Sequence, residues 1–161
     1  MQEGVTPTTA QIDVLQYGDV SARVVRGPAL HVITAPAPIL RDIHIVDTPG
    51  TNAIIRKHEA ITSEFVPRSD LVLFVTSADR PFTETERAFL ETVRGWGKKV
   101  VVVVNKVDIL ETERQAEEIR SFVAESVRAL LGFSPEIFLV SARLALRAKE
   151  GEPSVWAASR F

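Results

Sequence analysis

Residues 98–110, KKVVVVVNKVDIL, place an unbroken run of valines directly before a polar segment. Valine is β-branched and favours strands, and a strand that is apolar on both faces is typical of a parallel sheet covered by helices. Ligands of such sheets bind beyond the carboxyl ends of the strands, and Asn105, Lys106 and Asp108 occupy that position here. This stretch therefore predicts both an α/β fold and the place of a binding site.

Further strands and helices are predicted on both sides of the valine run. The other apolar, β-branched segments are residues 11–17, 23–33 with an interruption at Gly27-Pro28, 41–46, 70–76 and 136–140. A capping box at residues 83–86 predicts the start of one helix, and residues 111–131 carry apolar side chains at helical spacing before Gly132. The alternation predicts one three-layer α/β domain with a mostly parallel sheet.

Composition excludes several classes of function. The 161 residues can form one domain with a real core, and 45% hydrophobic with 25% charged residues is ordinary for a globular protein. A formal net charge of -2 provides no basic field, so we expect no nucleic-acid partner. The absence of cysteine excludes disulfides and cysteine metal sites. Without a signal peptide or an apolar run of about 18–20 residues, a cytoplasmic location is expected.

The segment N-K-V-D at 105–108 has the residue types of a guanine-binding loop. An acidic side chain at Asp108 can accept hydrogen bonds from both N1–H and N2–H of guanine, which adenine cannot offer. The stem of Lys106 can lie along the base, and Asn105 can tie neighbouring loops together. The alternative interpretation is a polar strand-to-helix loop, which the buried-looking strand before it disfavours.

A second element of the base pocket is predicted at residues 141–143, S-A-R, which follow the next strand. The backbone N–H of Ala142 could donate to guanine O6, and Ser141 could shape the turn. Taken alone, the segment is more typical of a strand that simply ends in serine. Its position one strand after N-K-V-D is what favours a functional interpretation.

The segment D-T-P-G at 47–50 is a candidate phosphate sensor. The Asp47 carboxylate, at the end of a predicted strand, can hold Mg²⁺, often through water, because this cation prefers oxygen ligands. Gly50 lets its own backbone N–H approach a γ-phosphate oxygen. An ordinary Asx turn with proline and glycine remains the alternative.

A threonine-rich loop at residues 4–10, GVTPTTA, precedes the first predicted strand. A threonine hydroxyl there can ligate Mg²⁺ while its backbone N–H contacts the γ-phosphate, so that the loop becomes ordered only with a triphosphate. Thr6, Thr8 and Thr9 compete for this role, and an ordinary loop is the alternative.

In this order, T-P-T-T, D-T-P-G, N-K-V-D and S-A-R resemble the second to fifth sequence elements of the regulatory GTPases. The fuller stretches EGVTPTTAQI, IHIVDTPGTNAI, LVLFVTSADRPFTETERAFL, KKVVVVVNKVDIL and IFLVSARLALRAK resemble bacterial dynamin-like GTPases over nearly the whole chain. The resemblance implies GTP or GDP with Mg²⁺, and Thr9 as the switch threonine and Mg²⁺ ligand beside Asp47. It also implies Asp47 and Gly50 as the γ-phosphate sensor. The guanine pocket would be formed by Asn105, Lys106, Asp108, Ser141 and Ala142.

Two departures from the family pattern affect the expected activity. The position after D-T-P-G is Thr51, not the glutamine that orients water in small signalling GTPases. No G-x-x-x-x-G-K-[ST] phosphate loop occurs in the sequence, where the family has a strand, that loop and a helix before EGVTPTT. We therefore expect residues 1–161 to be a partial GTPase domain, truncated at its N-terminus. Alone, it should be inactive and bind nucleotide no tighter than about 1 mM.

The resemblance also implies partners for a longer parent protein. Dynamin-like GTPases drive membrane remodelling, dimerise across the nucleotide face and contact membranes peripherally, on the cytoplasmic side here. A phosphate-loop-less scaffold that acts as an interaction module is the alternative. A ribosome-assembly-type GTPase fits less well, because 37 residues separate Thr9 from Asp47 where a plain hairpin needs about 15–20.

Overall fold

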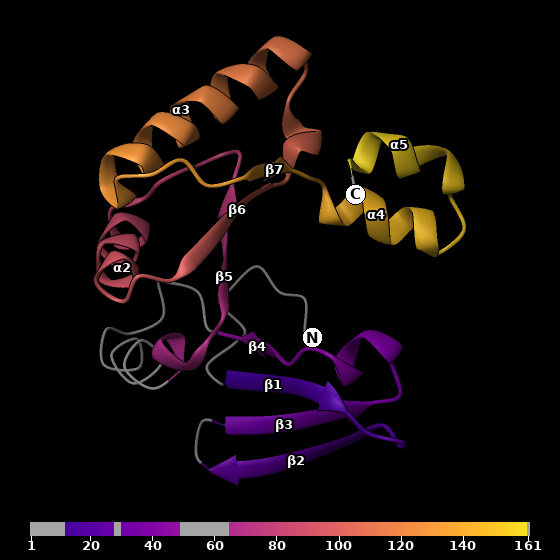
Figure 1. Cartoon of the computed structure of the whole chain (residues 1–161). Coiled ribbons are helices and arrows are strands. Elements are labelled where there is room, and N and C mark those ends of the chain that lie inside the picture. The colour runs from indigo at the N-terminus through magenta and orange to yellow at the C-terminus, as the bar shows by residue number, and fades with distance from the viewer. Residues whose placement is uncertain (1–11, 28–29, 49–64, 161) are drawn as a thin grey trace. The chain divides into compact units, whose positions relative to one another are not determined.

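The computed structural model describes residues 12–27, 30–48 and 65–160. The chain divides into two compact units, Met1–Glu64 and Phe65–Phe161, and the described part of each contains one β-sheet (Figure 1). Among the helices described, none is both long and apolar enough to cross a membrane.

The first unit contains a mixed four-stranded sheet in the order β2-β3-β1-β4. Its strands are β1 (Ile12–Tyr17), β2 (Ala22–Gly27), β3 (Leu30–Ala35) and β4 (Ile45–Asp47). Strand β1 runs parallel to β3, whereas β2 pairs antiparallel with β3 and β4 pairs antiparallel with β1. The predicted strands at 11–17 and 23–33, the latter broken near Gly27, are confirmed.

The predicted strand at 41–46 is wrong in its first half. Pro38–Arg41 forms a short 3₁₀ helix, η1, and the extended pairing is confined to Ile45–Asp47. Proline at the start of η1 has its φ preset near the helical value, and the turn continues as the Ile43 N–H donates to the Ile39 carbonyl at 3.2 Å. Apolar residue types alone did not reveal this local hydrogen bonding.

The second unit contains a parallel sheet in the order β5-β6-β7. Its strands are β5 (Leu71–Ser77), β6 (Lys99–Asn105) and β7 (Ile137–Leu139). Its α-helices are α2 (Glu84–Gly95), α3 (Glu113–Leu131), α4 (Ala142–Lys149) and α5 (Trp156–Ser159). Its short 3₁₀ helices are η2 (Val66–Arg68), η3 (Val107–Ile109) and η4 (Pro153–Val155). The predicted α/β class with a parallel sheet is confirmed.

The two long helices begin and end where their sequences predict. Thr83 and Glu86 form a reciprocal capping box at the start of α2, with the Thr83 N–H donating to the Glu86 carboxylate at 2.7 Å. Thr112 and Gln115 form the same motif at the start of α3. Gly132 ends α3 in the left-handed region at φ 80°, which glycine adopts without a Cβ clash.

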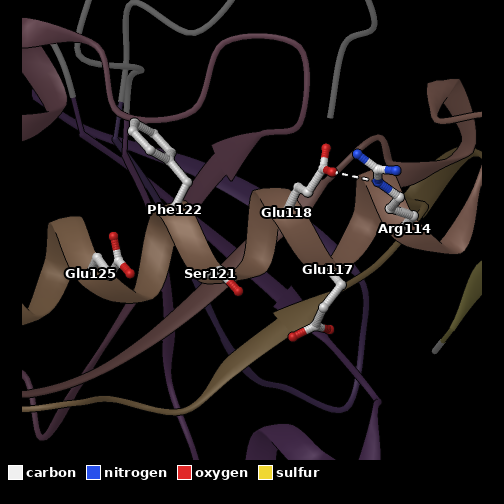
Figure 2. A pocket seen from close by; sticks show the side chains of 6 residues that line it. All are labelled: Arg114, Glu117, Glu118, Ser121, Phe122 and Glu125. Carbon is white, nitrogen blue, oxygen red and sulfur yellow. Dashed lines mark hydrogen bonds and ion pairs between the residues drawn. The ribbon is translucent and has the colours of Figure 1, made fainter.

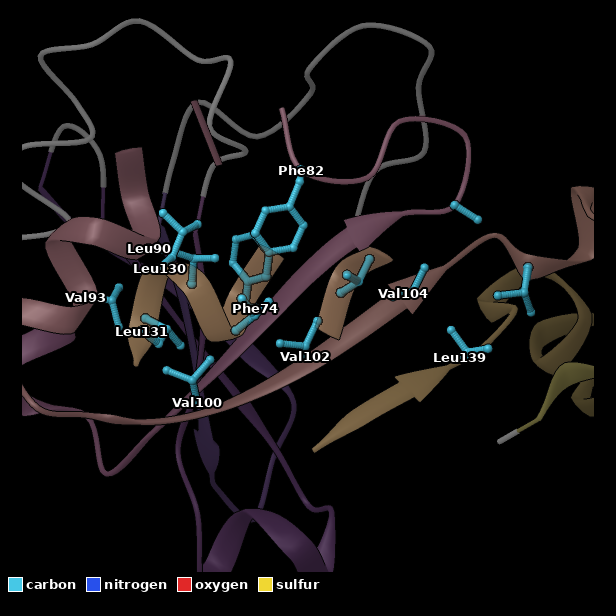
Figure 3. Packing of buried hydrophobic residues seen from close by; sticks show 14 of the residues in the cluster. Phe74, Phe82, Leu90, Val93, Val100, Val102, Val104, Leu130, Leu131 and Leu139 are labelled. Carbon is cyan, nitrogen blue, oxygen red and sulfur yellow. The ribbon is translucent and has the colours of Figure 1, made fainter. Parts of the chain in front are cut away.

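Helices α2 and α3 cover one face of the parallel sheet and form its core (Figure 3). Alternate valines of β6, Val100, Val102 and Val104, point into this core, where they meet Leu90 and Val93 of α2 and Val123 and Val127 of α3. Phe74 of β5 adds a stacked ring pair with Phe89 at 6.4 Å. This packing fixes β6, and therefore the residues that follow it.

The other face of the parallel sheet carries exposed apolar side chains in the part of the chain that is described. Leu71, Leu73 and Val75 of β5 are 47–59% exposed, and Phe138 of β7 is 50% exposed. The strand registers place Val75, Val103 and Phe138 in one row across the three strands. The three-layer fold predicted from the sequence would cover this face with helices, and that second helical layer stays a prediction.

Two leucines of this unit test which face carries the stability. We expect Leu90→Ala to lower the free energy of unfolding by about 2–5 kcal/mol, because Leu90 is fully buried and its removal leaves a cavity. Leu73→Ala, the matched control on the exposed face, should cost below about 1 kcal/mol. Urea unfolding of both variants measures the difference, and equal losses would show that the second face is packed as well.

Candidate functional site

The first part of the candidate site is the turn that follows β6. Strand β6 ends at Asn105, and Lys106 adopts a left-handed conformation at φ 65° before η3 begins at Val107. A residue with a side chain reaches this conformation only at some cost, which its surroundings must offset. The Asn105 side-chain oxygen does so here by accepting the Lys106 N–H at 2.7 Å. The turn thus brings Asp108 back toward the sheet edge.

The turn after β7 lies beside the turn after β6. The Val140 N–H donates to the Val104 carbonyl at 2.9 Å, and the Val107 N–H donates to the Val140 carbonyl at 3.2 Å. Ser141 is fully buried and caps α4, since its side-chain oxygen accepts the Leu144 N–H at 3.2 Å. Sequence reasoning missed α4, although a serine followed by good helix formers, A-R-L-A-L-R-A-K, was an available signal.

Asn105 joins the two turns through a single side-chain oxygen. Besides the Lys106 N–H, this oxygen accepts the backbone N–H of Ala142 at 3.0 Å, across 37 residues of sequence. The prediction that Asn105 ties neighbouring loops together is confirmed. The Ala142 N–H, which the sequence suggested for guanine O6, is donated to Asn105 in this structure.

The carboxylate of Asp108 is held from both sides. Its side chain is only 6% exposed, so its charge needs partners. Ser141 Oγ donates to Asp108 Oδ1, and Arg143 Nη2 lies 2.5 Å from Asp108 Oδ2. The structure therefore brings Asn105, Ser141 and Asp108 together as predicted, and adds Arg143, which follows Ala142 in the S-A-R segment and was given no role from sequence.

The turn after β5 contributes a further partner. The Ala78 N–H donates to the Asn105 carbonyl at 2.9 Å, and the Lys106 Nζ lies 3.6 Å from Asp79 Oδ1. A hydrogen bond from Ser77, together with the charge of Lys106, lowers the pKa of the exposed Asp79 carboxyl. Sequence reasoning missed Asp79, which positions the lysine stem from the neighbouring strand.

In the first unit, Asp47 ends β4 directly opposite Asp13 of β1. Partial burial and the nearby Asp13 carboxylate raise the pKa of Asp47. Asp13 is buried and pairs with His31 at 3.2 Å and Arg23 at 3.3 Å. Asp47 thus lies in an electronegative position that a cation would relieve.

Thr6, Thr8, Thr9 and Gly50 lie outside the described residues. Within residues 12–27, 30–48 and 65–160, no group of three or more histidine, aspartate or glutamate side chains is arranged to hold a metal ion.

A shallow hollow on α3 does not belong to this site. It is lined by Arg114, Glu117, Glu118, Ser121, Phe122 and Glu125 (Figure 2). All six residues come from one helix, and Arg114 Nε donates to Glu118 across one turn at 2.8 Å. None of the predicted site residues lines the hollow, so it is a feature of the solvated helix face.

The raised pKa of Asp47 predicts a pH effect on stability. A raised pKa means that the folded state binds the proton more tightly, so this group's contribution declines as pH rises from the ordinary value of 3.8 through the raised pKa. Asp47→Asn should therefore increase the free energy of unfolding at pH 7, by less than about 1 kcal/mol because solvent screens the partly exposed group. Urea unfolding at pH 4 and pH 7 measures this, with the exposed Asp42→Asn as control. A loss of stability at pH 7 would contradict the assignment.

Solved structures show the same fold at low sequence identity. The translation elongation factor SelB from Methanococcus maripaludis, in complex with the GTP analogue GPPNHP, matches with a TM-score of 0.53 and 13% identity. The match covers 86% of this chain and 27% of that chain. This likeness agrees with the predicted GTPase-type fold.

Known sequences identify the family. The probable transmembrane GTPase FZO-like, chloroplastic, of Arabidopsis thaliana is 49% identical over 92% of this chain, which spans 17% of that protein's length. Dynamin-like protein A of Bacillus subtilis is 24% identical over 68% of this chain, which spans 10% of its length. Plant and bacterial proteins both match, so the bacterial branch stays a prediction. A family model for the dynamin family matches residues 19–107, more than half of the sequence, and the chain belongs to that family.

Proposed function

We propose that this chain is the guanine-reading and phosphate-sensing part of a GTPase that hydrolyses GTP to drive membrane remodelling. The observation that carries the proposal is the Asp108 carboxylate, which is nearly buried beyond the end of a parallel sheet and oriented by Ser141. A buried acceptor with fixed direction is suited to a ligand that offers matched N–H donors.

Guanine recognition would use the residues that join the two turns. Asp108 would accept N1–H and N2–H of the base, while Ser141 keeps one carboxylate oxygen in place. Lys106 is 58% exposed, and its stem, anchored toward Asp79, is available to lie along the base. Ala142 would turn its N–H from Asn105 to guanine O6. The support for this assignment is that five predicted residues converge at one sheet edge.

Phosphate sensing would use the D-T-P-G segment and the threonine-rich loop. The carboxylate of Asp47 would be an oxygen ligand of Mg²⁺, with Thr9, or alternatively Thr8 or Thr6, as a second ligand. Its raised pKa, caused by partial burial and the nearby Asp13 carboxylate, supports a cation there. When bound, Mg²⁺ would neutralise charge on the phosphate oxygens of GTP. Gly50 would present its backbone N–H to the γ-phosphate.

In the full-length protein, we propose, GTP hydrolysis also uses groups outside residues 1–161. Thr51 stands where small signalling GTPases have a water-orienting glutamine. Hydrolysis would therefore depend on a group in the phosphate loop of the family and on a homodimer across the nucleotide face. We propose a bacterial, cytoplasmic protein that contacts the membrane peripherally. The net charge of -2 supports the absence of a nucleic-acid partner.

The substitution Asp108→Asn tests guanine recognition in the full-length gene product. It replaces a double acceptor by a group that both accepts and donates, so GTP binding should weaken by about 2–4 kcal/mol, roughly 30-fold to 1000-fold. Xanthosine triphosphate binding should improve, because xanthine offers an N–H and a carbonyl on that edge. Titration of a fluorescent analogue of each nucleotide measures both changes.

Asp70→Asn is the matched control for this experiment, since Asp70 is exposed and precedes β5 at the opposite end of the same sheet. It should leave both affinities unchanged. Unchanged GTP binding in Asp108→Asn would show that Asp108 does not read the base. Absence of GTP binding by the unmodified protein would favour the scaffold function instead.

A further inference from the structure

In this structure, protein groups occupy the oxygens and N–H that a guanine base would need. Asp108 Oδ1 accepts from Ser141, and Asp108 Oδ2 lies 2.5 Å from Arg143 Nη2. The Ala142 N–H is donated to Asn105 at 3.0 Å. These groups therefore satisfy one another within the protein.

The two partners of Asp108 differ in their freedom to move. Ser141 is fully buried, and its side-chain oxygen also caps α4, so displacing it would leave the Leu144 N–H without this acceptor. Arg143 is 69% exposed, and among the described residues its side chain makes one ion pair, to Asp108. Arg143 can therefore move into solvent without disturbing the start of α4.

The guanidinium of Arg143 presents the same kind of planar N–H donor pair as the guanine base. A guanidinium presents N–H donors from a planar N–C–N group, and the N1–C2–N2 edge of guanine does the same. Both groups are matched to a carboxylate, so they compete for Asp108. Adenine has an acceptor at N1 and cannot replace the donors that leave with Arg143.

We propose that Arg143 is a displaceable gate on the guanine site, which pairs with Asp108 when the base is absent and leaves it when guanine binds. This inference rests on the proposed function. The gate neutralises the nearly buried carboxylate, and it lowers the apparent affinity for guanine nucleotides by the work of breaking the pair. It also favours ligands whose own two N–H donors can replace those of Arg143 at Asp108.

The test is the affinity of the full-length gene product for GDP with Arg143→Met. Removal of the competing guanidinium should tighten GDP binding about threefold to tenfold at low salt. Arg143→Lys, which keeps a charge but not the planar donor pair, should tighten it less. At about 1 M salt, where the screening length is about 3 Å, the advantage of the methionine variant should shrink.

Arg147→Met is the matched control, because Arg147 lies on the same helix and pairs with Glu152 at 2.5 Å, away from Asp108. It should leave GDP affinity unchanged at both salt concentrations. Unchanged or weaker GDP binding in Arg143→Met would overturn the gate, since an arginine that supports the base gives that result. Failure of the unmodified protein to bind GDP would instead overturn the proposed function on which the gate rests.

Discussion

The side-chain oxygen of Asn105 connects the turns after β6 and β7, and the arrangement of the candidate site depends on that connection. The oxygen accepts the Lys106 N–H at 2.7 Å and the Ala142 N–H at 3.0 Å. The first bond supports the left-handed conformation of Lys106, which directs the chain into η3. The second holds the first residue of α4 against the end of β6. Through these two bonds, Asp108 and Ser141 come within hydrogen-bonding reach of each other.

The packing behind the site explains how the Asn105 side-chain amide can hold the turns after β6 and β7 together. Val102 and Val104 are fully buried between the sheet and helices α2 and α3, so the end of β6 is rigidly placed. The buried Ser141 then makes one oxygen serve as helix cap and as donor to Asp108. A polar cluster of this kind is stable only when its members are satisfied, since an unpaired buried carboxylate is costly. Arg143 completes that balance on the solvent side.

Much of this architecture could be predicted from the sequence because it follows local rules. The valine run before Asn105, the Thr83–Glu86 capping box and Gly132 each act over a few residues, and all three predictions are confirmed. The strand predicted at 41–46 was wrong in its first half because η1, which begins at Pro38, and its hydrogen bonds compete with extended pairing. The sequence also predicted which polar residues follow neighbouring strands, and therefore which would meet.

The parts of the site that could not be predicted depend on side-chain partners far apart in the sequence. Arg143 meets Asp108 across 35 positions, and Asp79 meets Lys106 across 27, with no periodic signal for either pair. The antiparallel opposition of Asp13 and Asp47 likewise follows from sheet register, which residue types do not specify. Such pairs are set by the tertiary fold and become visible only once the turns are placed beside one another.

Guanine recognition by Asp108 is tested most sharply by an experimental structure of the full-length gene product with bound GDP. Both carboxylate oxygens of Asp108 should lie about 2.7–3.1 Å from N1 and N2 of guanine, with Ser141 still bonded to Asp108. The Ala142 N–H should then donate to guanine O6 instead of Asn105, while the Asn105 side chain still accepts the Lys106 N–H. A guanine base bound elsewhere, or a base in this pocket that makes no hydrogen bond to Asp108, would show that Asp108 does not read the base.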